Sequence, residues 1–173
     1  TIGNANIFLG YLAGKSNTAS TNNIAIGKNA LGNISYSSIL AYPSNNIAIG
    51  LDALLNTNPS NIINGSSNIA IGYLSGRNNT TGIDNILIGA ESEVLTGNLT
   101  NASAIGANAQ VNTSNAMVLG SINGINNAVA TVKVGVGTTF PQNRLDDSGS
   151  LGLGIRLTTI NTTLGIDDHT III

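Results

Sequence analysis

The sequence predicts an all-β fold in which short parallel strands are stacked along a rod. Three observations lead to this prediction. A five-residue unit recurs along the chain, small residues recur at a fixed distance after it, and the composition favours residues that tolerate tight turns. Together they indicate a repetitive architecture of strands and turns.

The repeated unit consists of Asn, an apolar residue, a variable residue, an apolar residue and Gly. Its clear copies are Asn6-Ile-Phe-Leu-Gly10, Asn23-Ile-Ala-Ile-Gly27, Asn46-Ile-Ala-Ile-Gly50, Asn68-Ile-Ala-Ile-Gly72 and Asn85-Ile-Leu-Ile-Gly89. Degenerate copies end at Gly106, Gly120 and Gly137. The closing glycines are 17, 23, 22, 17, 17, 14 and 17 residues apart, which fits a minimal coil with insertions at one place.

A second column of residues supports the same register. Three positions after the closing Gly the residue is small, and the members of this column are Ala13, Ala30, Ala53, Ser75, Ser92 and Ala109. Two aligned columns at a fixed offset are hard to obtain by chance.

Within each unit the apolar residues alternate with a middle residue, which is the period of a β-strand. Five residues are too few for a helix, and the units are too close together for crossover helices. We therefore expect the units to stack in parallel, as in a β-solenoid or β-roll. The Asn before each strand suits a turn, and its amide can form a hydrogen-bonded ladder along the stack.

The composition argues against several classes of function. The chain has 27 Asn and 21 Gly, but only six Lys and Arg, one His and no Cys. Six scattered cations make no nucleic-acid footprint, and the residues for a His-based triad or a thiolate metal site are missing. No apolar run approaches the ~18 residues of a membrane span. We expect no nucleic-acid partner, cofactor, metal, membrane span or enzymatic activity.

The acidic pairs do not change this expectation. Asp146 and Asp147, Asp167 and Asp168, and Glu91 and Glu93 are interpreted as residues of solvated turns. Adjacent residues of a strand point to opposite faces, so such pairs are poor catalytic pairs.

A thin coil suggests that the chain does not stand alone. If the paired Ile side chains fill the interior, the middle residues of the strands form a second apolar strip outside, and such strips are normally covered. Small side chains let backbones of identical copies approach closely around an axis. The predicted interface residues are Ala25, Ala48, Ala70 and Ala104.

The repeated motif resembles the head repeats of trimeric autotransporter adhesins. The stretch from Val134 through Gly-Val-Gly-Thr-Thr-Phe to Pro141 and Leu145 is similar to a connector of bacteriophage tail fibres and related bacterial surface fibres. The resemblance implies a left-handed parallel β-roll in a homotrimer, located on a virion or a bacterial cell surface. It divides the chain into a roll at 1–137 and a connector with the start of a strand-rich module at 138–173.

Two insertions, at residues 33–45 and 55–67, interrupt the repeat. Loops on a regular scaffold often carry recognition, and Tyr36 and Tyr42 are the candidates for stacking on a sugar or contacting a protein. The competing interpretation, which we favour, is that the apolar residues of the insertions fold back onto the roll or a neighbouring chain.

The preferred function is that of a structural and adhesive segment of a homotrimeric surface fibre, a phage tail fibre or bacterial adhesin, that spaces and displays a binding tip. Its partners are then copies of itself, other fibre segments and a host-surface glycan or protein. Two alternatives remain: a module that binds a glycan or receptor directly through the inserted loops, and an ice-binding solenoid, which the missing Thr-x-Thr column weakens. A tail-spike depolymerase ranks last.

Overall fold

The computed structural model describes residues 3–35 and 40–148 of the chain. These residues form thirteen short strands and no helix, and every strand pair is parallel. The prediction of an all-β fold is therefore confirmed.

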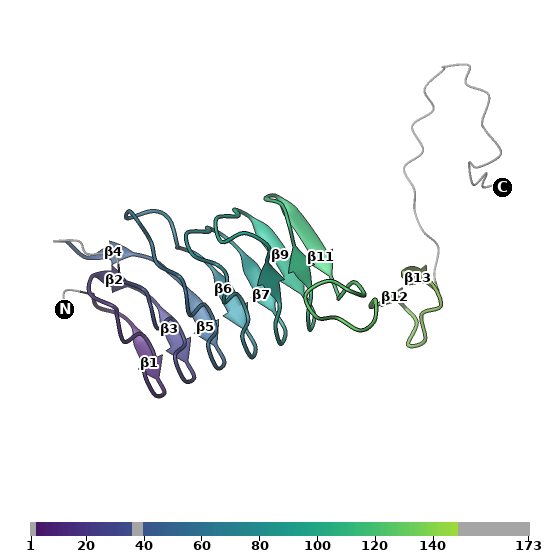
Figure 1. Cartoon of the computed structure of the whole chain (residues 1–173), viewed down its shortest axis with the longest axis horizontal. Helices are drawn as coiled ribbons and strands as arrows, with labels where there is room; N and C mark the ends of the chain where they lie inside the picture. The colour runs from purple at the N-terminus through teal and green to yellow at the C-terminus, as the bar shows by residue number, and fades with distance from the viewer. Residues whose placement is uncertain (1–2, 36–39, 149–173) are drawn as a thin grey trace, which may run out of the picture.

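Seven strands make the main sheet, and each of the first seven copies of the repeat supplies one of them. In sheet order they are β1 (Ile7–Leu9), β3 (Ile24–Ile26), β5 (Ile47–Ile49), β6 (Ile69–Ile71), β7 (Ile86–Ile88), β9 (Ala102–Ile105) and β11 (Ala116–Leu119). The chain visits them in sequence order, side by side along the long axis of Figure 1. The pairing keeps the register of the repeat, so that Ala25 lies beside Ala48 and Ala48 beside Ala70.

We call the stretch from one main-sheet strand to the next a coil. Each coil turns after its strand and runs back opposite the main sheet. We call this returning part the return wall, so that the main sheet and the return wall are the two walls of the stack. Two shorter parallel pairs lie on the return path: β2 (Ser20–Thr21) with β4 (Tyr42–Pro43), and β8 (Glu93–Val94) with β10 (Gln110–Val111).

The closing glycines are required at the first turn of each coil. Gly27 has a φ of +128°, and a Cβ at this position would lie 2.5 Å from the carbonyl oxygen of Gly50 in the next coil. The same relation links Gly50 to Gly72 and Gly72 to Gly89. Both the backbone conformation and the close approach exclude a side chain, as the recurrence of Gly predicts.

The Asn column forms the predicted ladder, and Asn23, Asn46, Asn68 and Asn85 are buried. The side-chain oxygen of Asn46 accepts the backbone N–H of Asn68 at 2.9 Å, and the side-chain amide of Asn46 donates to the carbonyl of Gly65 at 2.8 Å. The side-chain oxygen of Asn68 likewise accepts the backbone N–H of Asn85, and its side-chain amide donates to the carbonyl of Gly82. Each amide thus joins two coils and satisfies a turn inside a core that water does not reach.

Large side chains from the return wall fill the interior between the two walls. Leu31 and Leu54 are fully buried, as is Leu87 from the main sheet. At Gly76 a Cβ would meet both Leu54 and Leu87, at 2.9 and 2.8 Å, so these leucines occupy the space that the missing side chain leaves. The core is therefore packed by complementary sizes across neighbouring coils.

The main sheet ends at β11. The copy that closes at Gly137 forms β12 (Val134–Val136), which pairs in parallel with β13 (Leu145–Asp147) in a separate two-stranded sheet. Our expectation that this copy adds an eighth coil to the stack was wrong, because its pairing partner is the chain beyond Pro141. The expected start of the strand-rich module, at residues 158–173, lies outside the described residues.

Candidate interaction surface

The structure reverses the expected orientation of the main-sheet strands. Ala25, Ala48, Ala70 and Ala104 have no exposed surface in the single chain, because they point between the two walls of the coils. The prediction that this column forms the interface with neighbouring copies was wrong. Its place is the core.

The reason is the width of a coil. The return wall already contributes large side chains to the interior, with Leu31 and Leu54 immediately after the small-residue column. The space left in front of the main sheet accommodates Ala, and two Ile side chains per strand would overpack it. The β period of two then places the residues on either side of each Ala on the outside.

The outward side chains make two parallel columns on the main sheet. The first outer column contains Ile7, Ile24, Ile47, Ile69, Ile86, Ser103 and Met117, and the second outer column contains Leu9, Ile26, Ile49, Ile71, Ile88, Ile105 and Leu119. Thirteen of these fourteen positions are apolar. At the ends of the first column, Ile7 is 56% and Met117 61% exposed.

The two columns form a narrow apolar strip along the stack. Seven strands spaced 4.7–4.9 Å apart give it a length of about 30 Å, and the columns are about 7 Å apart. Scattered exposed isoleucines need no explanation, whereas a continuous apolar strip is a candidate interaction surface.

The apolar surface continues around the glycine edge of the sheet. The residue that follows the closing Gly is a large apolar one in three coils, and Tyr11, Leu51 and Tyr73 are all exposed. Lys28 takes this position in the second coil, and Ala or Ser takes it in the last three. The second outer column therefore borders a further apolar flank on the far side of the turn. Together they form a surface with two sides that meet at an edge.

The two tyrosines proposed for recognition have different outcomes. Tyr42 is 4% exposed and lies in β4 on the return wall, so its side chain is not available to a large ligand, and this candidate was wrong. Tyr36 lies outside the described residues. Ile34, in the same insertion, is also fully buried, which agrees with the interpretation that apolar residues of the insertion fold back.

The second insertion has an ordered tip that displays two apolar side chains. The side-chain oxygen of Asn64 accepts the N–H groups of Ser60 and Asn61, and that of Asn61 accepts those of Ile63 and Asn64. Ile62 and Ile63 remain exposed. The hydrogen bonds hold the backbone of the tip, while its isoleucines contact solvent.

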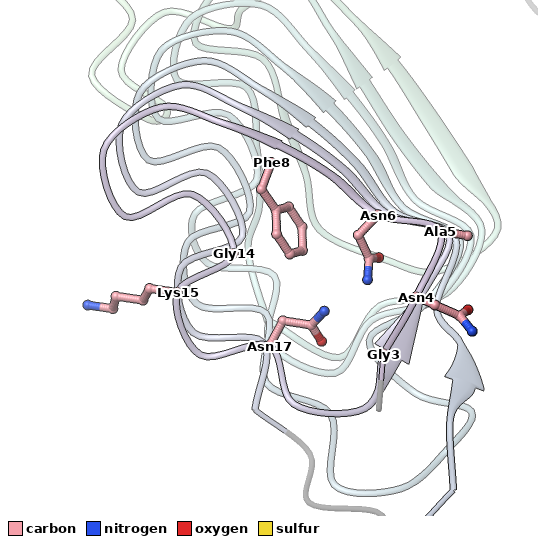
Figure 2. Close-up of a pocket in the computed structure, with 8 residues that line it drawn as sticks. All are labelled: Gly3, Asn4, Ala5, Asn6, Phe8, Gly14, Lys15 and Asn17. Atoms are coloured by element: carbon pink, nitrogen blue, oxygen red, sulfur yellow. The ribbon is translucent and has the colours of Figure 1, made fainter. Parts of the chain in front are cut away.

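A depression of about 440 Å³ opens at the N-terminal end of the stack (Figure 2). Its floor is the ring of Phe8, which lies in the column of the buried alanines, and Asn6, Gly14 and Asn17 contribute to its rim. The interior of the first coil is thus partly open, and Phe8 is 37% exposed.

Sequence reasoning missed the burial of Glu93. It lies in β8, is 5% exposed, and both carboxylate oxygens accept the N–H of Asn78 at 3.1 Å. Burial raises the pKa of Glu93 to about 7, although the hydrogen bonds from Asn78 and Val94 and the charge of Arg77 oppose this shift. The interpretation of this residue as part of a solvated turn was wrong, and no sequence signal distinguishes it from Glu91.

Within residues 3–35 and 40–148, no three acidic, His or Cys side chains gather as a metal site would require. The same residues contain no helix that could span a membrane.

Comparison of the chain with family models, with curated proteins and with solved structures finds no match.

Proposed function

We propose that the chain is a structural and adhesive segment of a homotrimeric surface fibre, of the kind found in phage tails or on bacterial cells. In this proposal the coils form a left-handed β-roll, three rolls pack along a common axis, and the connector at β12 and β13 leads to further fibre segments. The fibre spaces and displays a binding tip. The observation that supports it is the pair of apolar outer columns.

The outer columns are suited to contacts between identical chains. They run along all seven strands, with Ser103 as the one polar member, so a copy lying parallel to the first covers all seven strands at once. Covering them removes apolar surface from water at about 25 cal/mol per Å². The repeated coils supply the same contact many times over, which is how a fibre gains strength from a short motif.

The shape of the apolar surface favours three chains over two. The outer columns alone form a strip about 30 Å long and about 7 Å wide, or about 200 Å², which is below the ~800 Å² per partner of a standard stable interface. A face-to-face dimer would bury this strip and leave the flank with Tyr11, Leu51 and Tyr73 exposed. Around a three-fold axis each chain contacts two neighbours, and both sides of the edge can be covered.

The ordered tip of the second insertion favours a second candidate function, direct binding of a host-surface receptor. Ile62 and Ile63 are exposed on a backbone that hydrogen bonds already hold, so binding would require little further ordering. If this function is correct, replacing both with Ser should weaken attachment to host cells without changing the melting temperature.

Oligomeric state in solution tests the fibre proposal. We expect the unmutated chain to run as a trimer in size-exclusion chromatography with light scattering. Replacing Ile26, Ile49 and Ile71 together with Lys should yield folded monomers, because the charges stand on the outside of the coils. The matched control is Ala48→Lys, which puts one charge in the core and should unfold the chain. A folded, monodisperse monomer of the unmutated chain would contradict the proposal.

A further inference from the structure

In the described part of the chain, the first strand of the main sheet, β1, is paired on one side only. In the next coil the N–H of Gly27 donates back to the carbonyl of Leu9 at 2.8 Å, and the carbonyl of Asn23 accepts an N–H of β1 at 2.8 Å. Among the described residues, the equivalent N–H of Gly10 and carbonyl of Asn6 have no such partners. An open strand edge of this kind is a template for another strand.

The Asn ladder is open at the same end. Its first step is the side-chain oxygen of Asn6, which accepts the backbone N–H of Asn23 at 2.9 Å. In the part of the chain that the structure describes, the N–H of Asn6 itself has no acceptor. Continuing the ladder therefore requires a side-chain oxygen from a strand on the open side of β1.

The opposite end of the stack is closed. The N–H of Ala102 is accepted by the side chain of Asn85 at 2.9 Å, but Ala102 has no side-chain oxygen with which to continue the ladder. After the last strand the chain folds back in a loop, in which the N–H of Val132 donates to the carbonyl of Ser121 at 2.9 Å. A Cβ at Gly120 would collide with Val132, so this loop covers the last closing glycine of the main sheet.

The depression at the open end offers backbone groups rather than free polar side chains (Figure 2). The side-chain amides of Asn6 and Asn17 both donate to the carbonyl of Ser20 at 3.0 Å, and Lys15 points away from the depression. What remains available is the edge of β1 and the exposed part of the Phe8 ring. This chemistry fits a polypeptide strand better than a small polar ligand.

The chain already fills part of the layer beyond β1. The N–H of Gly3 and the carbonyl of Asn4 bond to the end of the first coil at 3.2 and 3.3 Å. The N–H of Gly82 and the carbonyl of Ile83 bond in the same way to the coil that follows them. Gly3 and Asn4 therefore lie where a coil ends, and the place left beside β1 is that of the strand and first turn of a coil.

We propose that the open edge of β1 is a docking site for one further parallel strand, supplied by an adjoining segment of the fibre. The origin of this partner rests on the proposed function, whereas its chemistry follows from the unpaired groups of β1. Fibre segments follow one another along the axis, so the open end meets its neighbour as the connector does at the closed end. The added strand extends the main sheet by the pairing that already joins its seven strands.

The groups of β1 define the sequence pattern of the partner. Its strand must begin with Asn, whose side-chain oxygen accepts the N–H of Asn6. It must end with Gly next to Gly10, because a Cβ there would meet the backbone of Gly10 as one at Gly27 would meet the carbonyl oxygen of Gly50, at 2.5 Å. The middle residue is small, because the ring of Phe8 already occupies the interior. The partner therefore carries the pattern of the repeat itself.

A chain extended by one coil tests the docking edge. A copy of residues 68–79 joined ahead of Thr1 makes, with residues 1–5, a coil of 17 residues in which Gly3 takes the place of Gly82. Hydrogen exchange measured by NMR reports on the amides of Asn6 and Gly10. Both should exchange about tenfold or more slowly than in the unextended chain, because each gains a hydrogen bond.

Two variants of the added coil are the matched controls. Asn68→Ala in the copy removes only the side-chain oxygen, so the amide of Asn6 should return to fast exchange while that of Gly10 stays protected. Gly72→Val in the copy should release both amides, because its side chain does not fit against the backbone of Gly10. The amide of Gly27, which is bonded in every variant, shows whether the stack itself stays folded.

The outcomes separate this inference from the proposed function. Fast exchange of Asn6 and Gly10 in the extended chain would overturn the docking edge and leave the fibre proposal standing. Slow exchange of both in the unextended chain, increasing with protein concentration, would show that a second copy covers the edge and would overturn it equally. A monomeric unmutated chain would overturn the fibre proposal and the origin of the partner, while protection in the extended chain would still support the docking edge.

Discussion

The ring of Phe8 occupies the space that a side chain at Gly14 would need. A Cβ at Gly14 would lie 2.5 Å from Cε2 and Cζ of that ring. In the next coil the sizes are exchanged, with Ala25 in the strand and Leu31 in the column of Gly14. In these two coils the interior therefore holds one large side chain, which the strand supplies in the first coil and the return wall in the second.

This relationship predicts that the two positions are coupled. Phe8→Ala should destabilise the chain by about 1–2 kcal/mol, less than for a fully buried Phe because the ring is partly exposed. Gly14→Leu alone should also destabilise, because the two side chains overlap. The loss of unfolding free energy in the double variant should be smaller, by about 1 kcal/mol or more, than the sum of the losses in the two single variants. Leu31 has a φ of +49° in the same column, so the backbone of Gly14, at +58°, can carry Leu.

Chemical denaturation of the two single variants and the double variant measures this coupling. Additive losses would show that Phe8 and Gly14 do not share one space.

The closing glycines are predicted to be intolerant of any side chain. Gly27→Ala should cost about 3 kcal/mol or more, because its Cβ collides with the backbone of Gly50 and its φ is +128°. Gly124→Ala is the matched control, since its φ is +80° but no atom lies within 4 Å of the added Cβ. It should cost only the conformational strain of about 1–2 kcal/mol. Equal losses of melting temperature for both would contradict the role of close backbone approach.

The sequence predicted the elements of the main sheet because each carries its own local signal. Alternation around Ala48 identifies a strand, Gly50 marks the turn that only Gly can make, and Asn46 marks the ladder. These features depend on residues close together in the chain. Parallel pairing in register then follows from the identity of the repeats.

The orientation of the strands could not be predicted in the same way. Alternation defines two faces, but which face is inside depends on the space that the return wall leaves. The sequence does not show that Leu31 and Leu54 point into that space. The pairing of the last repeat could not be predicted from its own residues either. Val134 and Val136 match the strand pattern, but pairing with β13 is decided by the chain that follows. Burial of Glu93 likewise depends on packing that no neighbouring residue reveals.

The buried Asn ladder should contribute more to stability than exposed asparagines do. Asn46→Ala leaves the N–H of Asn68 and the carbonyl of Gly65 without partners inside the core, which should cost about 2–4 kcal/mol. Asn98→Ala, at an exposed position, is the control and should change stability by less than about 0.5 kcal/mol. Urea denaturation distinguishes them, and similar midpoints for the two variants would show that water replaces the ladder.

Burial of Glu93 predicts that the chain is more stable in mild acid than at neutral pH. The pKa of this carboxyl is raised from 4.5 to about 7 in the folded chain, so between these values the folded state binds more protons than the unfolded state. The free energy of unfolding therefore falls as the pH rises from about 4.5 to 7, by up to about 3 kcal/mol for this group alone, and then levels off.

Glu93→Gln should remove this dependence and raise stability at neutral pH, because Gln fills the same space without a charge to desolvate. Its amide oxygen can still accept the N–H of Asn78. Glu91→Gln, at a half-buried position two residues earlier, is the matched control. Denaturation midpoints at several pH values between 4 and 8 provide the measurement. Parallel pH profiles for the unmutated chain and Glu93→Gln would contradict the raised pKa, because they would show that folding does not change the proton affinity of Glu93.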